Sequence, residues 1–180
     1  MRIAGTLDWQ PAAEHPELLA PSVAAAVSAL QLDCHVAPID PGLADTAAFC
    51  AAYQVPPEIS ANCVVVTGRR GEVSTMAACM VLAPDRADVN KTVRKHLDVR
   101  KISFANMEEA VARTGMEYGG ITPIGLPDGW PILVDSAAIE PEWVVVGSGI
   151  RGSKIILPGR TLARLPYAEV LELTQREPSG

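Results

Sequence analysis

The sequence predicts an α+β protein (mixed α/β), with a curled, largely antiparallel, barrel-like mixed sheet and helices packed outside it. The predicted strands are short and joined by tight turns, and the helices fall between them at irregular intervals. No repeating strand–helix–strand unit is visible, which argues against a parallel α/β fold. A chain of 180 residues that is 48% hydrophobic suits one domain with a real core. That core is expected to be aliphatic, since aromatic residues make up only 4% of the chain.

Strands are predicted where apolar, β-branched residues run between turn residues. They are expected over residues 32–36, 62–67, 72–83, 99–104, 131–134, 143–146, 154–157 and 168–173. The second and third should form a hairpin around a turn at 68–71.

Helices are predicted from apolar spacing and from capping residues. They are expected over residues 16–30 with a break at Pro21, over 46–53, from Asp85 or Asp88 through 97, and over 106–113, with a turn or short helix at 158–165. Asn106 is the expected N-cap of the 106–113 helix, because Glu109 follows three residues later. Residues 174–180 should be a frayed tail.

Charge and composition exclude several classes of protein. A net charge of −6 and a pI near 5.0 argue against a protein that coats nucleic acid, so no DNA partner is expected. No apolar run is long enough to span a membrane and no secretory leader is apparent, so the interpretation is a cytoplasmic chain with reduced thiols. The cysteines are spaced without a C-x-x-C pair and predict neither a metal site nor another cofactor: Cys34, Cys50, Cys63 and Cys79.

Residues 114–127 are the most informative stretch. They hold four glycines and two prolines in fourteen residues, yet remain apolar, unlike a flexible linker. This predicts a rigid, half-buried loop in which adjacent glycines present main-chain N–H groups to a small polar ligand or an oxyanion. A tight turn between two elements is the alternative.

The run from Tyr118 to Gly125 (YGGITPIG) resembles the G-x-x-x-P loop of the YbaK/ProX family of aminoacyl-tRNA deacylases, which are related to the editing domain of bacterial prolyl-tRNA synthetases. The resemblance covers about residues 45–173 of a single domain spanning 1–180, and leaves 1–40 as an N-terminal extension. It implies catalysis by backbone donors of the loop and substrate contacts from its neighbours. The implied catalytic residues are Gly119 and Gly120, and the implied substrate-binding residues are Tyr118, Ile121, Thr122 and Pro123.

Asn62 tests this resemblance, because in the family a lysine opens the corresponding strand and lies beside the glycine loop. Asparagine can donate and accept hydrogen bonds but cannot place a positive charge near a developing oxyanion. Asn62 is therefore either a catalytic residue that positions water, a mark of altered or lost activity, or a strand-edge residue with no role. Met80 and Val146 are expected to help wall a small pocket that selects amino acids by size.

Residues 147–152 spell G-x-G-x-x-G, the fingerprint of dinucleotide-binding proteins. That fingerprint requires a helix to begin at the glycines, whereas here a β-like segment ending at Pro158 follows. A hairpin turn is predicted instead. Since the turn matches a glycine-rich segment of the family near the pocket, Ser148 and Gly149 are further candidates for substrate contact.

Six of the fifteen Lys and Arg residues lie within residues 86–101. They form either a solvated helix face or a patch that contacts tRNA phosphates. The predicted tRNA-binding residues are Lys91, Arg94, Lys95, Arg100 and Lys101.

Together these features predict a trans-acting protein that hydrolyses the ester of mischarged aminoacyl-tRNA by using positioned water and backbone donors. Its expected partner is the aminoacyl-tRNA acceptor end, with an aminoacyl-tRNA synthetase as a second candidate. The alternative is a non-catalytic binding module with the same pocket, which the asparagine at position 62 favours.

Overall fold

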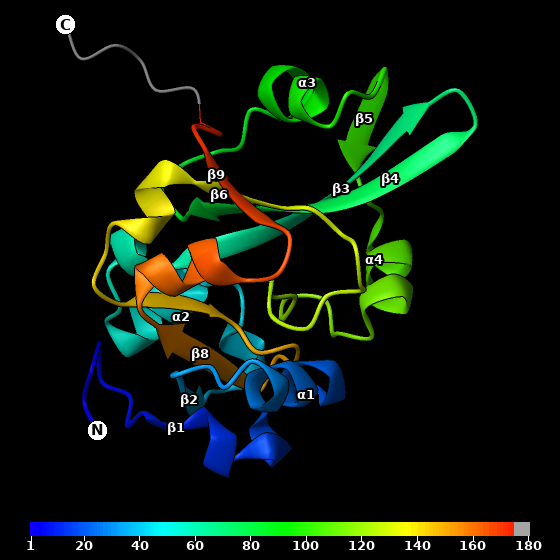
Figure 1. Ribbon diagram of the computed structural model, residues 1–180. Coiled ribbons are helices and arrows are strands. Elements are labelled where there is room, and N and C mark those ends of the chain that lie inside the picture. Colours follow the sequence, from blue (N-terminus) through cyan, green and yellow to red (C-terminus); the bar gives the residue numbers. More distant parts are fainter. Residues whose placement is uncertain (175–180) are drawn as a thin grey trace, which may run out of the picture.

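The computed structural model describes residues 1–174, in which two β-sheets carry the fold (Figure 1). The first sheet is antiparallel, in the order β1-β2-β8-β7. Its strands are β1 Gln10–Pro11, β2 His35–Pro38, β7 Val144–Gly147 and β8 Ser153–Leu157. The second sheet has the order β5-β3-β4-β6-β9 and is mixed, because β6 runs parallel to both β4 and β9. Its strands are β3 Ala61–Arg70, β4 Val73–Leu82, β5 Lys101–Phe104, β6 Ile132–Asp135 and β9 Ala168–Leu171.

The mixed α+β class is confirmed, whereas a single barrel-like sheet is not. The two sheets are separate and meet at a parallel bridge between Ser60, just before β3, and Val145 in β7. The sheets stay open because β5 and β9 end one of them and β1 and β7 end the other.

Within residues 1–174, four α-helices lie outside the sheets, as do several short 3₁₀ segments. The α-helices are α1 Pro21–Ala29, α2 Thr46–Tyr53, α3 Arg94–His96 and α4 Met107–Thr114. The 3₁₀ segments are Ala12–Glu14, Pro16–Leu18, Pro41–Leu43, Pro57–Ile59, Ser136–Ile139 and Gly159–Arg164. None of the helices within residues 1–174 is long and apolar enough to cross a membrane.

Local signals placed two helices well. The α2 bounds match the prediction, and the Asn106 side chain accepts a hydrogen bond from the Glu109 amide at 2.7 Å, which confirms the N-cap of α4. The helix predicted through residue 97 is instead a π-helical turn, Val89–Val93, followed by the single turn of α3. Proline breaks the first predicted helix, so that only α1 is an α-helix there.

The predicted turn at 68–71 is shorter in the structure. β3 continues to Arg70 and Gly71 takes a left-handed conformation (φ +63°), so only two residues separate the strands. Gly68 lies within β3, where a Cβ atom would come within 2.8 Å of the Val99 side chain. Gly68 is therefore needed for close packing against Val99 and not for a turn.

Residues 1–40 contribute to two of the three hydrophobic cores found among residues 1–174. Val23 and Val27 of α1 pack in the core that contains alternate residues of β8, Ile155 and Leu157. Trp9 packs in the second core, on the opposite face of β8. The N-terminal forty residues thus cover β8 on both faces.

Candidate functional site

The loop from Gly115 to Pro127 follows α4 and forms no helix or strand. Gly119 has φ +89°, which a residue with a side chain rarely adopts. Gly120 has an ordinary φ, but a Cβ atom there would come within 2.7 Å of the Ile150 backbone. The two adjacent glycines are therefore needed for different reasons, one for its conformation and the other for close backbone contact.

A cavity of about 290 Å³ lies between this loop, the start of β3 and the start of α2. It brings Asn62 and Gly119 to one site, as the sequence predicted they would meet. Its lining residues come from five segments: Ala44, Asp45, Thr46, Ala61, Asn62, Cys63, Val64, Tyr118, Gly119, Ile121, Gly147 and Lys154.

Main-chain donors are available in this cavity. The amides of Gly119 and Ile121 donate no hydrogen bond to any residue of the described chain. The Gly120 amide, in contrast, donates to the Glu117 carbonyl at 2.9 Å and is used within the loop. The main-chain amides that are free to bind a ligand are thus those of Gly119 and Ile121, on either side of Gly120.

Asn62 is held by α2. Thr46 donates its hydroxyl to the Asn62 side-chain oxygen at 2.5 Å. This contact leaves the NH₂ group of Asn62 without a partner among residues 1–174, so a ligand or water in the cavity can accept from it.

Arg151 ties the loop to the start of α2. Its guanidinium donates to the carbonyl oxygens of Tyr118 (3.1 Å) and Pro41 (3.2 Å) and lies 3.5 Å from the Asp45 carboxylate. A Cβ atom on Gly119 would come within 2.2 Å of the same guanidinium. The arginine thus packs against the left-handed glycine and braces it. No local sequence pattern predicts a role for this residue.

Lys154 is the cation inside the cavity, and sequence analysis missed it too. It lies in β8 with only 8% of its surface exposed, and its ammonium group is 5.4 Å from the centre of the Phe49 ring. Burial lowers the pKa of Lys154 from 10.5 to about 8. The available signal was a lone lysine at the start of an otherwise apolar strand, KIIL.

The cysteines are poor nucleophiles. Burial raises the pKa of Cys63, which lines the cavity, and raises that of Cys79 to about 12, so both remain thiols at neutral pH. His96 lies 3.1 Å from Glu169 and not beside Cys79. Within residues 1–174, no group of three or more His, Cys, Asp or Glu side chains could hold a metal ion.

The other residues proposed for the pocket lie behind its surface. The following are buried and do not line the cavity: Met80, Gly120, Thr122, Pro123, Val146, Ser148 and Gly149. Their roles in substrate binding or catalysis remain predictions. In the structure they lie behind the residues that line the cavity and support them.

The G-x-G-x-x-G segment is a hairpin turn, as predicted, because β7 and β8 pair antiparallel around it. The Ser148 hydroxyl lies 3.1 Å from the Ile150 and Ser153 carbonyl oxygens and 2.6 Å from the Ser153 hydroxyl, which holds the turn together. The Gly149 amide donates to the Gly120 carbonyl at 2.7 Å. The turn therefore fastens the glycine loop from behind.

Part of the basic segment forms a groove at the outer end of β3. Arg94, Arg100 and Lys101 line a depression of about 610 Å³ together with Arg69, which the sequence analysis did not include. Lys91 and Lys95 are exposed but lie outside this groove. Arg69 is seven residue steps along β3 from Asn62, which at ~3.3 Å per residue is roughly 23 Å.

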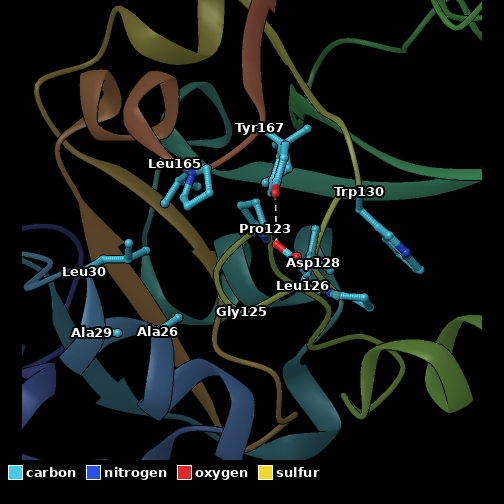
Figure 2. Close-up of a pocket in the computed structure, with 13 residues that line it drawn as sticks. Ala26, Ala29, Leu30, Pro123, Gly125, Leu126, Asp128, Trp130, Leu165 and Tyr167 are labelled. Atoms are coloured by element: carbon cyan, nitrogen blue, oxygen red, sulfur yellow. Dashed lines mark hydrogen bonds between the residues drawn. The ribbon is translucent and has the colours of Figure 1, made fainter.

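A second cavity of about 250 Å³ lies on the other half of the glycine–proline loop (Figure 2). It is mainly apolar, with Leu30, just after α1, on one side and Pro123 and Leu126 of the loop on the other. Its acidic residue, Asp128, accepts a hydrogen bond from the Tyr167 hydroxyl at 3.0 Å. The groove therefore differs from the first cavity in having no buried lysine and in having its carboxylate already hydrogen-bonded, among the residues that the structure describes.

Three comparisons bear on these features. The model of the aminoacyl-tRNA editing domain matches residues 40–165. The "Putative Cys-tRNA(Pro)/Cys-tRNA(Cys) deacylase EbsC" of Enterococcus faecalis is 26% identical over 87 residues, which are 48% of this chain. This chain spans about half (53%) of the length of that curated relative.

Solved structures share the fold. The crystal structure of "a putative trans-editing enzyme for prolyl tRNA synthetase" matches with a TM-score of 0.73 at 20% identity, over 88% of this chain and 99% of that one. The crystal structure of "hypothetical protein APE2540" matches with a TM-score of 0.76 at 19% identity, over 86% and 99%. At these identities the likeness concerns the fold.

Proposed function

The chain belongs to the aminoacyl-tRNA editing domain family, and from that premise we propose that it hydrolyses the ester of mischarged aminoacyl-tRNA as a free-standing, trans-acting protein. The observation that carries the proposal is the cavity in which Asn62, Lys154 and the unpaired amides of the glycine loop meet. Its volume of about 290 Å³ is at the small end of ligand sites, which suits an amino acid joined to a terminal ribose.

The cavity supports hydrolysis without a strong side-chain base. An aminoacyl ester is already activated, so holding water in line with its carbonyl carbon and stabilising the oxygen accounts for much of the catalysis. We assign the stabilising donors to the amides of Gly119 and Ile121, because the Gly120 amide is engaged. The free NH₂ group of Asn62 is suited to bind the attacking water or the ester.

The basic groove is the proposed contact for tRNA phosphates. It opens roughly 23 Å along β3 from the cavity, so one tRNA acceptor arm can place its 3′ end at Asn62 and its backbone near Arg69 and Arg100. Backbone contacts of this kind bind without reading sequence and weaken as salt rises. A synthetase is a second proposed partner, and the substrate places the proposed activity in the cytoplasm.

A non-catalytic module remains the second candidate function. It is favoured by the neutral Asn62 at the position where the YbaK/ProX family carries a lysine. Such a module would hold an aminoacylated tRNA end in the same cavity without accelerating hydrolysis.

The test is to incubate the protein with tRNA charged with cysteine, alanine, serine or proline and to follow ester loss against buffer. Cysteine comes first, because Cys-tRNA stands in the name of the curated relative. Acceleration with one of these substrates is expected. Tight tRNA binding without acceleration would favour the module, and activity that appears only in Asn62→Lys would identify a decayed enzyme.

The tRNA contact is tested separately by salt dependence. Replacing Arg69 and Arg100 with Gln should raise KM and reduce the slope of log KM against log salt by about 1 per lost phosphate contact. Arg160→Gln, at an exposed position of the 3₁₀ segment Gly159–Arg164, is the matched control and should leave the slope unchanged. Equal slopes for all three proteins would remove the groove from the proposal.

A further inference from the structure

One buried charge has no partner within the part of the chain that the structure describes, and it lies in the candidate cavity. We propose that Lys154 is the catalytic cation of this site, contacting the carbonyl oxygen of the aminoacyl ester in place of a lysine at position 62. The inference rests on the proposed hydrolysis and extends it by naming the charged group.

The sheet register brings Lys154 to the glycine loop. Lys154 pairs with Gly147 across the β7–β8 hairpin, and both residues line the cavity. Gly147 in turn packs against the loop, since a Cβ atom on it would come within 2.5 Å of the Gly120 carbonyl oxygen. Lys154 is therefore one strand away from the loop that provides the free amides.

The side chain is buried without an acidic partner. It is 8% exposed, and within residues 1–174 no carboxylate lies within ion-pair distance of it and no hydrogen bond from its ammonium group is found. Its close contact is the face of Phe49. Burying an unpaired cation is costly, so an anion that forms transiently in the cavity would be bound strongly there.

The charged and titratable groups facing Lys154 come from three segments. Asp45, just before α2, favours the protonated lysine, Arg151 from the hairpin turn opposes it, and Cys50 from α2 favours it slightly. Asp45 is itself exposed and lies 3.5 Å from Arg151, so it does not neutralise Lys154. With a pKa of about 8, Lys154 is roughly nine-tenths protonated at pH 7.

The reaction needs only water as its second reactant. The oxygen of water bonds to the ester carbon while the carbonyl π electrons move onto the carbonyl oxygen, which Lys154 and the loop amides stabilise. The electron pair on the carbonyl oxygen then re-forms the C=O bond as the carbon–ribose oxygen bond breaks, and the proton lost by the attacking water passes to the departing ribose oxygen. Lys154 keeps its proton throughout and contributes its charge.

A purely structural role is the alternative, in which Lys154 only packs on Phe49. The two roles differ in their effect on stability. Replacing a buried, unpaired cation with an apolar side chain of similar length is neutral or stabilising. Lys154→Met should therefore keep or raise the melting temperature while it removes activity.

The decisive experiment compares four proteins for hydrolysis of the charged tRNA that the wild type hydrolyses best. They are the wild type, Lys154→Met, Lys154→Met combined with Asn62→Lys, and Arg160→Met as a control for loss of one positive charge. We expect kcat to fall about 100-fold or more in Lys154→Met, as when an oxyanion-stabilising donor is removed. The double variant should regain at least a tenth of wild-type kcat, and the control should match the wild type.

Each outcome decides a different claim. A wild type that hydrolyses none of the charged tRNAs defeats the proposed function, and the catalytic role of Lys154 with it. An active wild type with an equally active Lys154→Met defeats this inference alone. A change in KM with kcat unchanged would also defeat the inference. The same holds if kcat falls together with the melting temperature and the double variant does not regain activity.

The pH profile gives a second readout. Acceleration over buffer at the same pH should fall as the pH rises through about 8, because Lys154 loses its charge there. A lysine acting as a general base would give a rise through the same pH. In the Lys154→Arg variant the acceleration should not fall over this pH range, since arginine stays protonated.

Discussion

The two cavities on either side of the glycine–proline loop differ in polarity although one loop lines both. The cavity at Gly119 holds a buried lysine, an asparagine and two unpaired amides, whereas the groove at Leu126 is apolar and its Asp128 is already bonded to Tyr167. The difference comes from the segments opposite, which include β3, β8 and the start of α2 in one case, and α1, β6 and residues 165–167 in the other. The loop supplies shape and backbone donors, and its partners determine the chemistry.

The largest effect on stability and hydrolysis is expected from adding a methyl group at Gly120, in the part of the loop that lies behind the polar cavity. In Gly120→Ala the new Cβ would come within 2.7 Å of the Ile150 backbone, which cannot rotate away as a side chain can. We expect a loss of about 1–3 kcal/mol in the free energy of unfolding and loss of most hydrolysis, because the loop must shift away from the β7–β8 turn.

The control for this change is Gly129→Ala, next to the apolar groove. Its Cβ would meet nothing within 4 Å, so only the cost of the positive φ (+83°) remains, about 1–2 kcal/mol. Chemical denaturation and a deacylation assay on both variants make the comparison. If Gly129→Ala lost hydrolysis as severely as Gly120→Ala, the distinction between the two cavities would be wrong.

The next effect concerns Lys154 and stability. The unfolded chain binds the Lys154 proton up to about pH 10.5, whereas the folded chain releases it near pH 8. Stability therefore rises with pH across that window, by up to about 3 kcal/mol, as the cost of burying the charge disappears. Denaturation of the wild type and Lys154→Met between pH 7 and 10.5 tests this.

The difference between these two proteins is the quantity to measure, because buried thiols act in the opposite direction. Burial raises the pKa of Cys34 to about 12, so ionisation of thiols in the unfolded chain lowers stability above about pH 9. Both proteins share that loss. Parallel stability curves would mean that Lys154 titrates normally in the folded chain.

Sequence reasoning succeeded where the signals are local. Asn106 followed by Glu109 marks a helix start, and the glycines and prolines of 115–127 mark a rigid loop, whatever the rest of the chain does. The meeting of Asn62 with Gly119 was also predicted, but from family resemblance. Lys154, Arg151 and Arg69 were missed because their positions depend on strand pairings between distant segments, such as β2 with β8, which no local pattern specifies. The same long-range pairing divides the predicted single sheet into two.

A smaller effect is expected from Arg151, the brace on the polar side. Arg151→Met removes its hydrogen bonds to the Tyr118 and Pro41 carbonyls and should cost about 1 kcal/mol of stability. With the loop less restrained, KM should rise several-fold, and the alkaline fall in acceleration should move to higher pH because Arg151 no longer opposes protonation of Lys154. Arg113→Met is the matched control, because its 3.9 Å pair with Glu109 is largely exposed. Equal KM values for the two variants would show that Arg151 does not brace the site.

The smallest effect is expected in the apolar groove. Tyr167→Phe removes an exposed hydrogen bond to Asp128 and keeps the ring, so stability should change by no more than about 0.5–1 kcal/mol and hydrolysis should be unchanged. Leu30→Gln on the α1 side of the groove should likewise leave kcat and KM at wild-type values, since Leu30 is 40% exposed. A fall in kcat/KM in both variants, with stability preserved, would mean that substrate extends beneath the loop into the groove. The two cavities would then act as one site, and the polar contrast between them would describe two ends of a single substrate.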